Sequence, residues 1–130
     1  MRYNLTVIDI DPLDEEDVTI SINGKILRCW MGYSDRRIEV GGKYTGEIFM
    51  KSNHKFSMKE SQKKVKEVIR LHKVRFDYLV RGILDVDNRT IDAGILLDTE
   101  SRSEFFDYGY LHDKYIECVI SKIELYVHGE

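Results

Sequence analysis

The sequence from residue 17 to residue 30 reads DVTISINGKILRCW, two alternating runs of apolar and polar residues joined by Asn23-Gly24. Asparagine and glycine adopt positive φ with little strain, as both central residues of a type I′ turn require. We therefore predict a two-residue β-hairpin, whose register decides which side chains are buried. The register pairs Ile20 with Leu27 and Val18 with Cys29 on one face, and Thr19 with Arg28 and Asp17 with Trp30 on the other.

Period-two alternation continues along the chain and indicates further strands. We expect them at residues 3–7, 43–50, 78–86, 89–98 and 115–127. Gly41-Gly42 predicts a loop before the second of these, and Asp87-Asn88 predicts the turn of a second hairpin. The apolar parity flips near Ser121, where a β-bulge would bend the last strand.

Residues 57–73 change to a helical period. Ser57 followed by Glu60 fits a capping box, in which the hydroxyl and the carboxylate each bind a free backbone N–H. An apolar stripe follows at helical spacing, while most lysines lie off it. The stripe consists of Val65, Val68, Ile69 and His72. We predict one amphipathic helix over residues 58–73.

The expected order is three meandering strands, a helix, a hairpin and a closing strand. This layout resembles a small antiparallel barrel of the oligonucleotide/oligosaccharide-binding (OB) type with an extra C-terminal strand. A β-sandwich with one packed helix is the alternative. The chain has 130 residues, one proline and no Pro/Gly/Ser-rich stretch, so we expect a single domain over residues 1–130.

The charge is unevenly distributed, although the formal net charge is only −3. Residues 1–50 carry 6 basic and 9 acidic side chains, residues 51–75 carry 9 and 2, and residues 76–130 carry 5 and 12. Proteins that coat nucleic acids are usually net basic, so this balance argues against that class. It allows a local basic patch.

Composition also predicts a compartment. No apolar run approaches the roughly 20 residues of a membrane span, and the first residues lack the apolar run of a signal peptide. We expect a cytoplasmic protein with no membrane partner. Cys29 and Cys118 are therefore expected to be buried, unpaired thiols rather than a disulfide or a zinc site.

Motifs for catalysis are missing from the sequence. It contains no GxGxxG or GxxxxGK[ST] phosphate loop, no GxSxG elbow and no HExxH pair. Asp85, Asp87 and Asp92 fail the calcium-loop pattern because Arg89 stands at the third ligand position. We expect no enzymatic activity, no catalytic residues, no cofactor and no specific metal. A third hypothesis is a small hydrolase or metal-dependent enzyme without recognisable motifs, which would need a pocket that gathers two or more of the histidines with acidic residues.

Two clusters suggest a protein partner. The acidic run is a solvated loop or a docking surface for a basic protein, because such clusters accelerate encounter with cationic surfaces. The aromatic run is loop packing or an interface anchor. The residues concerned are Asp9, Asp11, Asp14, Glu15, Glu16 and Asp17, and Phe105, Phe106, Tyr108 and Tyr110. The leading hypothesis is a non-enzymatic protein-binding domain of the bacterial immunity or inhibitor type; a homo-oligomer is possible too.

The alternative is an OB-type module for single-stranded nucleic acid. Such binding needs aromatic side chains interleaved with basic ones on an open sheet face. The candidate face consists of Arg28, Trp30, Phe49, Lys63 and Arg70. The net acidity of the chain weighs against this hypothesis.

Overall fold

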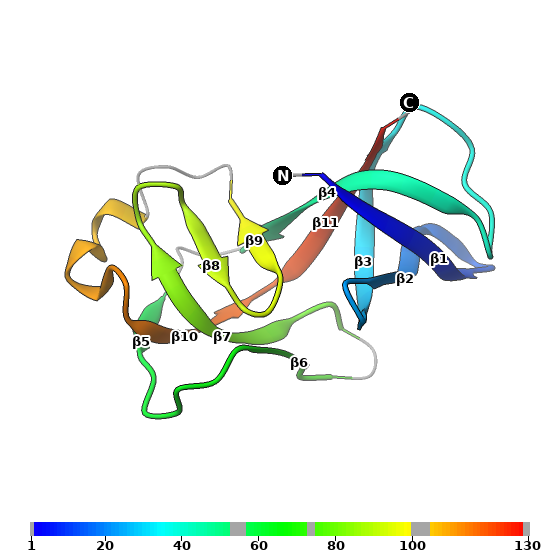
Figure 1. Cartoon of the computed structure of the whole chain (residues 1–130). Coiled ribbons are helices and arrows are strands. Elements are labelled where there is room, and N and C mark those ends of the chain that lie inside the picture. Colours follow the sequence, from blue (N-terminus) through cyan, green and yellow to red (C-terminus); the bar gives the residue numbers. More distant parts are fainter. Residues whose placement is uncertain (1, 53–56, 73–74, 100–104, 129–130) are drawn as a thin grey trace. The chain divides into compact units, whose positions relative to one another are not determined.

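The computed structural model describes residues 2–52, 57–72, 75–99 and 105–128, and the chain is mainly β (Figure 1). Internal contacts group it into two compact units. Unit 1 comprises Met1–Ile48 and Ile123–Glu130, and unit 2 comprises Phe49–Lys122. Among the described residues, no helix is long and apolar enough to cross a membrane. The expectation of a single domain stays a prediction.

Unit 1 is built on a ring of five strands. The strands are β1 (Tyr3–Asp11), β2 (Asp14–Ile22), β3 (Lys25–Ser34), β4 (Lys43–Lys51) and β11 (Lys122–His128). Their order is β1-β2-β3-β11-β4, and β1 also pairs with β4, which closes the ring. The β3–β11 pairing is parallel, and β1 runs antiparallel to both β2 and β4.

The β2–β3 hairpin confirms the predicted register. Ile20 opposes Leu27, Val18 opposes Cys29, Thr19 opposes Arg28 and Asp17 opposes Trp30. Asn23 and Gly24 both have positive φ, 47° and 75°, as the type I′ turn requires. The inward residues of this hairpin are 0–1% exposed, so the turn sets which side of both strands enters the core of unit 1.

Both cysteines are free and buried, as expected from the sequence. Cys29 is 0% exposed on β3 and Cys118 is 2% exposed on β10 (Tyr115–Ile120). Burial in apolar surroundings disfavours the thiolate. It raises the pKa of Cys29 far above its ordinary value and that of Cys118 to about 12. Both thiols are therefore unreactive packing groups.

Unit 2 is organised around β7 (Tyr78–Asp85), which pairs antiparallel with β6, β8 and β10. The other elements are β5 (Met58–Glu60), β6 (Glu67–Arg70), β8 (Thr90–Asp92), β9 (Leu96–Asp98) and the 3₁₀ helix η1 (Gly109–Leu111). On the outward face of β7, Arg81 binds Glu67 at 2.6 Å and lies 3.9 Å from Glu117. This charged row joins β6, β7 and β10.

The predicted helix over residues 58–73 is wrong. Its first residues form β5, and residues 67–70 form β6, in which Val68 opposes Val80 and Ile69 opposes Leu79. β-Branched residues such as Val68 and Ile69 favour an extended backbone, and pairing with β7 satisfies their backbone groups. Val65 and Ile69, members of the expected apolar stripe, are 39% and 38% exposed.

The second predicted hairpin forms around Asp87-Asn88, with β7 and β8 as its arms. The single strand predicted over residues 89–98 is wrong, because the chain turns after Asp92 and β9 pairs antiparallel with β8. The hairpin register opposes Asp85 to Thr90 and Ile83 to Asp92, so the two aspartates do not face each other. The predicted last strand divides at Ser121 into β10 and β11, where the apolar parity flips. The backbone N–H of Ser121 there binds the carbonyl of Lys51 at 2.9 Å.

The close approach at Gly82 yields a stability prediction. A Cβ at this position would lie 2.1 Å from the backbone oxygen of Asp92, whereas one at Gly109 would meet nothing within 4 Å. We expect Gly82→Ala to lower the free energy of unfolding by about 2 kcal/mol or more, because the backbone of β8 must shift. Gly109→Ala is the control, and it should change the free energy of unfolding by about 0.5 kcal/mol or less. Urea denaturation measures both, and equal effects would contradict the described packing.

Candidate functional site

The β1–β2 hairpin carries most of the predicted acidic surface. Asp9, Asp14, Glu15 and Glu16 are exposed, and Asp11 is half-buried. Two of these carboxylates also fix the tip. Asp11 accepts the backbone N–H of Leu13 at 2.8 Å, and Asp14 accepts that of Glu16 at 3.1 Å. The carboxylates are therefore presented from a hairpin whose tip is ordered by its own side chains.

Apolar side chains are exposed on the same hairpin. Leu13, at the tip, is 95% exposed, and Ile8, at a register shift of β1, is 41% exposed. Within the described residues, the five acidic side chains of the previous paragraph form no ion pair. Unit 1 as a whole carries 6 basic and 11 acidic residues, a formal net charge of −5. The hairpin thus combines uncompensated negative charge with an exposed leucine.

Asp17 belongs to the fold rather than to this surface. It is 8% exposed, and its two carboxylate oxygens accept hydrogen bonds from Arg28, Nε to Oδ1 at 2.8 Å and Nη2 to Oδ2 at 2.6 Å. The pair links β2 to β3 on the outward face. Asp17 is thereby removed from the candidate docking surface, and the charge of Arg28 in the alternative nucleic-acid face is neutralised.

A groove of about 660 Å³ lies beside the acidic hairpin. Two parts of its lining carry charge: Glu15 and Glu16 form an acidic wall, and Arg36 and Arg37 form a basic wall. The other lining side chains are mostly apolar. The lining residues are Ile10, Glu15, Glu16, Met31, Ser34, Arg36, Arg37 and Ile38. Sequence reasoning missed Met31 and Ile38, which carry no motif. Extending the predicted hairpin register by one pair places Met31 opposite Glu16, and this pairing could have linked Met31 to the acidic surface.

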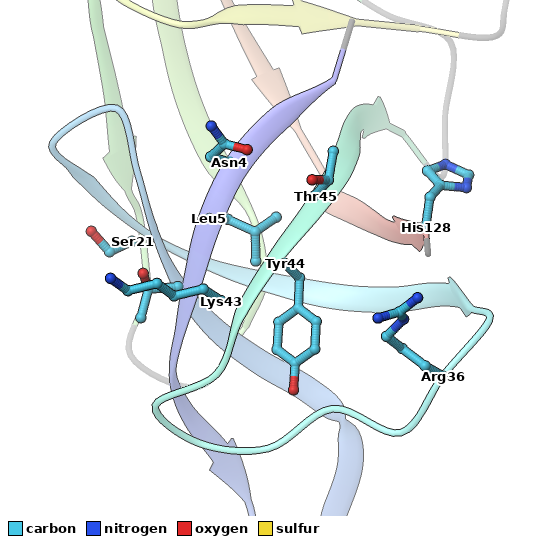
Figure 2. Close-up of a pocket in the computed structure, with 9 residues that line it drawn as sticks. Asn4, Leu5, Ser21, Arg36, Lys43, Tyr44, Thr45 and His128 are labelled. Atoms are coloured by element: carbon cyan, nitrogen blue, oxygen red, sulfur yellow. The ribbon is translucent and has the colours of Figure 1, made fainter. Parts of the chain in front are cut away.

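Figure 2 shows a second cleft of unit 1, of about 470 Å³. It is lined by Asn4, Leu5, Thr6, Ser21, Arg36, Lys43, Tyr44, Thr45 and His128, a set without a carboxylate. Strand pairing puts Thr6 of β1 between Ser21 and Lys43, and Figure 2 draws Tyr44 and Arg36 on the other side of β1 from the Lys43 side chain. The Tyr44 hydroxyl also accepts the Glu39 N–H at 2.8 Å. The cationic groups therefore do not converge on one point.

In unit 2, Asp85, Asp87 and His112 offer three ligand atoms within 4.8 Å of one another. Most of this capacity is used by the turn itself. The Asp85 oxygens accept the Asn88 backbone N–H at 3.1 Å and its side-chain amide at 2.7 Å. His112 accepts the Val86 N–H through Nδ1 at 3.2 Å. The cluster is accounted for as a β-turn and gives no argument for a metal ion.

The aromatic run does not form one patch. Phe105 is 0% exposed and belongs to the core of unit 2, whereas Phe106 and Tyr110 are 67% and 69% exposed. Tyr108 is half-buried, with its ring centroid 6.4 Å from that of Tyr110. Only Phe106, Tyr108 and Tyr110 offer surface to a partner, and they lie on the other unit from the acidic hairpin.

The alternative nucleic-acid residues are also divided between the units. Arg28 and Trp30 lie on β3 of unit 1, and Trp30 is half-buried. Phe49, Lys63 and Arg70 lie in unit 2. Lys63 and Arg70 are exposed, and Arg70 donates its Nε–H to the backbone oxygen of His72 at 2.8 Å. Arg28 and Trp30 share the outward face of β3, whereas the other three residues belong to unit 2.

A family model described as "Uncharacterised conserved protein UCP019853" matches residues 1–127. The match covers nearly the whole chain, so the protein belongs to this family. Comparison with curated proteins and with solved structures gave no significant match.

The Asp17–Arg28 pair predicts a stability effect distinct from binding. Asp17→Ala removes a carboxylate that accepts two hydrogen bonds from the largely buried Arg28 side chain, so we expect the free energy of unfolding to fall by about 3 kcal/mol. The double variant Asp17→Leu/Arg28→Met removes both charges and should lose less. Glu16→Ala, at an exposed position, is the control. Thermal and urea unfolding measure all three, and a double variant as unstable as Asp17→Ala would contradict this account.

Asp85 gives a titration prediction. Hydrogen bonds from Asn88 to the carboxylate hold the pKa of Asp85 below its ordinary value of 3.8. Because the folded-state pKa is depressed, Asp85 stabilises the fold above its ordinary pKa, and this contribution disappears as the pH falls through the folded-state pKa. We expect Asn88→Ala to raise the pKa of Asp85 in an NMR titration. The pKa of Asp92, depressed chiefly by Lys66, should stay unchanged, and an unaltered Asp85 would contradict the assignment.

Proposed function

We propose that this protein binds a basic protein through the acidic β1–β2 hairpin. The carrying observation is that its tip exposes uncompensated carboxylates around Leu13, which is 95% exposed. Asp9, Asp14, Glu15 and Glu16 supply the charge, and Asp11 both contributes charge and holds the tip. The hairpin is the surface, and Leu13 is its apolar anchor.

Electrostatics supports a cationic partner. Like charges on neighbouring residues repel one another, and a basic surface relieves that repulsion on binding. The formal net charge of −5 on unit 1 extends the same sign beyond the hairpin, which steers a basic protein toward it and repels polyanions. An apolar residue at the centre of a charged surface supplies the desolvated contact that lowers the dissociation rate.

We further propose that the five-stranded ring is of the OB type. A three-stranded meander, the parallel β3–β11 pairing and the antiparallel β1–β4 pairing support this interpretation. OB domains bind ligands over their second and third strands and the adjoining loops, which include the loop between the first two strands. In this chain the corresponding loop is the acidic tip. If the chain binds its ligand at the same place as OB domains do, the binding loop is negatively charged, whereas nucleic acid requires a positively charged one.

The proposed role is non-enzymatic masking of a basic surface, as an immunity or inhibitor protein performs it. A groove built to bind phosphate is such a surface, and an acidic hairpin is complementary to it in charge. The buried and inert thiols of Cys29 and Cys118 agree with a role that needs no nucleophile.

Single-stranded nucleic acid is the second candidate ligand. The strand order of the ring and the carboxylate-free cleft of Figure 2 favour it. The Asp17–Arg28 pair and the acidity of unit 1 oppose it, because each stacked base brings a phosphate that needs a cation. Steep weakening by salt together with loss of binding on Trp30→Ala would identify this activity.

A comparative pull-down tests the proposed function. The wild-type chain and the variant Asp14→Asn/Glu15→Gln/Glu16→Gln serve as baits in native lysate, with and without nuclease treatment, followed by mass spectrometry. We expect the wild type to retain a stoichiometric basic protein after nuclease treatment. We expect the triple variant to retain about a tenth as much or less, because three carboxylates of the interface are neutralised.

A variant with the same change in net charge is the control. Glu39→Gln/Glu60→Gln/Asp87→Asn neutralises three exposed carboxylates outside the hairpin and should retain the partner as the wild type does. If both triple variants lost the same amount of partner, net charge alone would explain the loss, and this would contradict the assignment of the binding surface to the hairpin. Recovery of nucleic acid, or of proteins that disappear after nuclease treatment, would favour the second candidate.

A further inference from the structure

Backbone hydrogen bonds hold the basic wall of the groove beside the acidic hairpin in place. The segment that follows β3 is fixed at both ends by backbone hydrogen bonds, Asp35 N–H to Val127 O at 3.3 Å and Gly41 N–H to Val7 O at 2.8 Å. Between these points, the Arg36 N–H binds the Ser34 hydroxyl at 3.3 Å. A wall held in this way loses little conformational freedom when a ligand binds.

The acidic wall is also ordered. Glu15 and Glu16 belong to β2, directly after the tip that the carboxylates of Asp11 and Asp14 fix. The groove is therefore bounded by two preorganised segments of the same unit. Its volume of about 660 Å³ is within the range of peptide- and ligand-sized sites, roughly 300–1,000 Å³.

The two walls carry opposite charges that do not neutralise each other. Within the described residues, neither Glu15 nor Glu16 forms an ion pair with Arg36 or Arg37. Arg36 instead pairs with Asp35, with 3.3 Å between Nε and Oδ1. Arg37 is exposed and forms no ion pair in the described part of the chain. A wholly basic ligand would meet Arg37 unfavourably, so a negative group on the ligand is favoured at that wall.

Ile10, Met31 and Ile38 also line the groove, and these half-buried side chains form the apolar part of its lining, the floor. Each keeps part of its side chain in contact with solvent, and covering this surface with another apolar group is favourable. The floor therefore favours a ligand that carries a large apolar side chain as well as charged groups.

We propose that the groove binds an extended segment of the basic partner in which a Lys or Arg, a large apolar residue and an Asp or Glu occur close together. The cation faces Glu15 and Glu16, the apolar side chain covers Met31 and Ile38, and the carboxylate faces Arg37. This inference rests on the proposed function and adds to it the chemistry of the recognised segment.

The test is selection from a phage-displayed library of random linear peptides on the immobilised wild-type chain. Synthetic copies of the enriched peptides are then titrated by fluorescence anisotropy. We expect enrichment of short segments that combine a basic, a large apolar and an acidic residue. We expect Met31→Asn and Arg37→Gln each to weaken their binding by about tenfold.

Matched controls lie on the same unit outside the groove. Ile26→Asn replaces an apolar residue of β3 that is 69% exposed, and Lys43→Gln removes an exposed cation. Both should bind the peptides as the wild type does. Because Met31 is half-buried, circular dichroism and thermal unfolding of Met31→Asn verify that it is folded, and Arg37→Gln tests the groove at an exposed position.

The outcomes separate the two proposals. Purely basic peptides that lose affinity in Glu15→Gln/Glu16→Gln, but not in Met31→Asn or Arg37→Gln, would overturn the groove and leave the acidic docking surface standing. Enriched peptides without basic residues, or no enrichment at all, would count against both. The same loss in the controls as in the groove variants would overturn the groove.

Discussion

The pairing of β1 along both of its edges is the constraint on which unit 1 depends. With β2 on one side and, at Tyr3–Thr6, β4 on the other, β1 closes five strands into a ring. Because side chains alternate across a strand, this closure decides which residues of β1 are interior. Leu5 and Val7 are 3% and 0% exposed as a result. The acidic tip continues β1 and β2, so its carboxylates stand on a base that the ring holds in place.

Local turn chemistry made part of this fold predictable. Asn23-Gly24 and the flanking alternation determined both the turn type and the register of β2 and β3, because every partner lies within a few residues. Residues 58–73 could not be predicted in the same way, since a capping-box pattern and helical spacing are also local signals. The competing partner, β7, lies outside that window, and its pairing with β6 prevailed over local propensity. The parallel β3–β11 pairing is equally non-local, so alternation revealed the strands but not their neighbours.

The candidate site shows the same limit. A run of acids is visible in any sequence. The hairpin register placed Asp17 and Arg28 on one face, but the sequence analysis did not predict their ion pair and assigned the two residues to different candidate surfaces. The groove was not visible, because Met31 and Ile38 come together with Ile10 only when the ring closes. Phe105 is buried and its neighbour Phe106 is exposed. A run of aromatic residues in the sequence does not indicate which of them enters the core.

The ring also has a consequence for the time course of folding. β11 pairs with β3 across a sequence separation of roughly 90 residues, with the whole of unit 2 between them, and contacts of this separation are made slowly. During synthesis the β1–β2–β3 meander leaves the ribosome long before the strand that completes the ring. In that interval the edge of β3 has no β11 to pair with, and it can pair with other extended chains. A hairpin that forms quickly from local signals, as β2 and β3 do, reduces incorrect strand pairing in the nascent chain before β11 is synthesised.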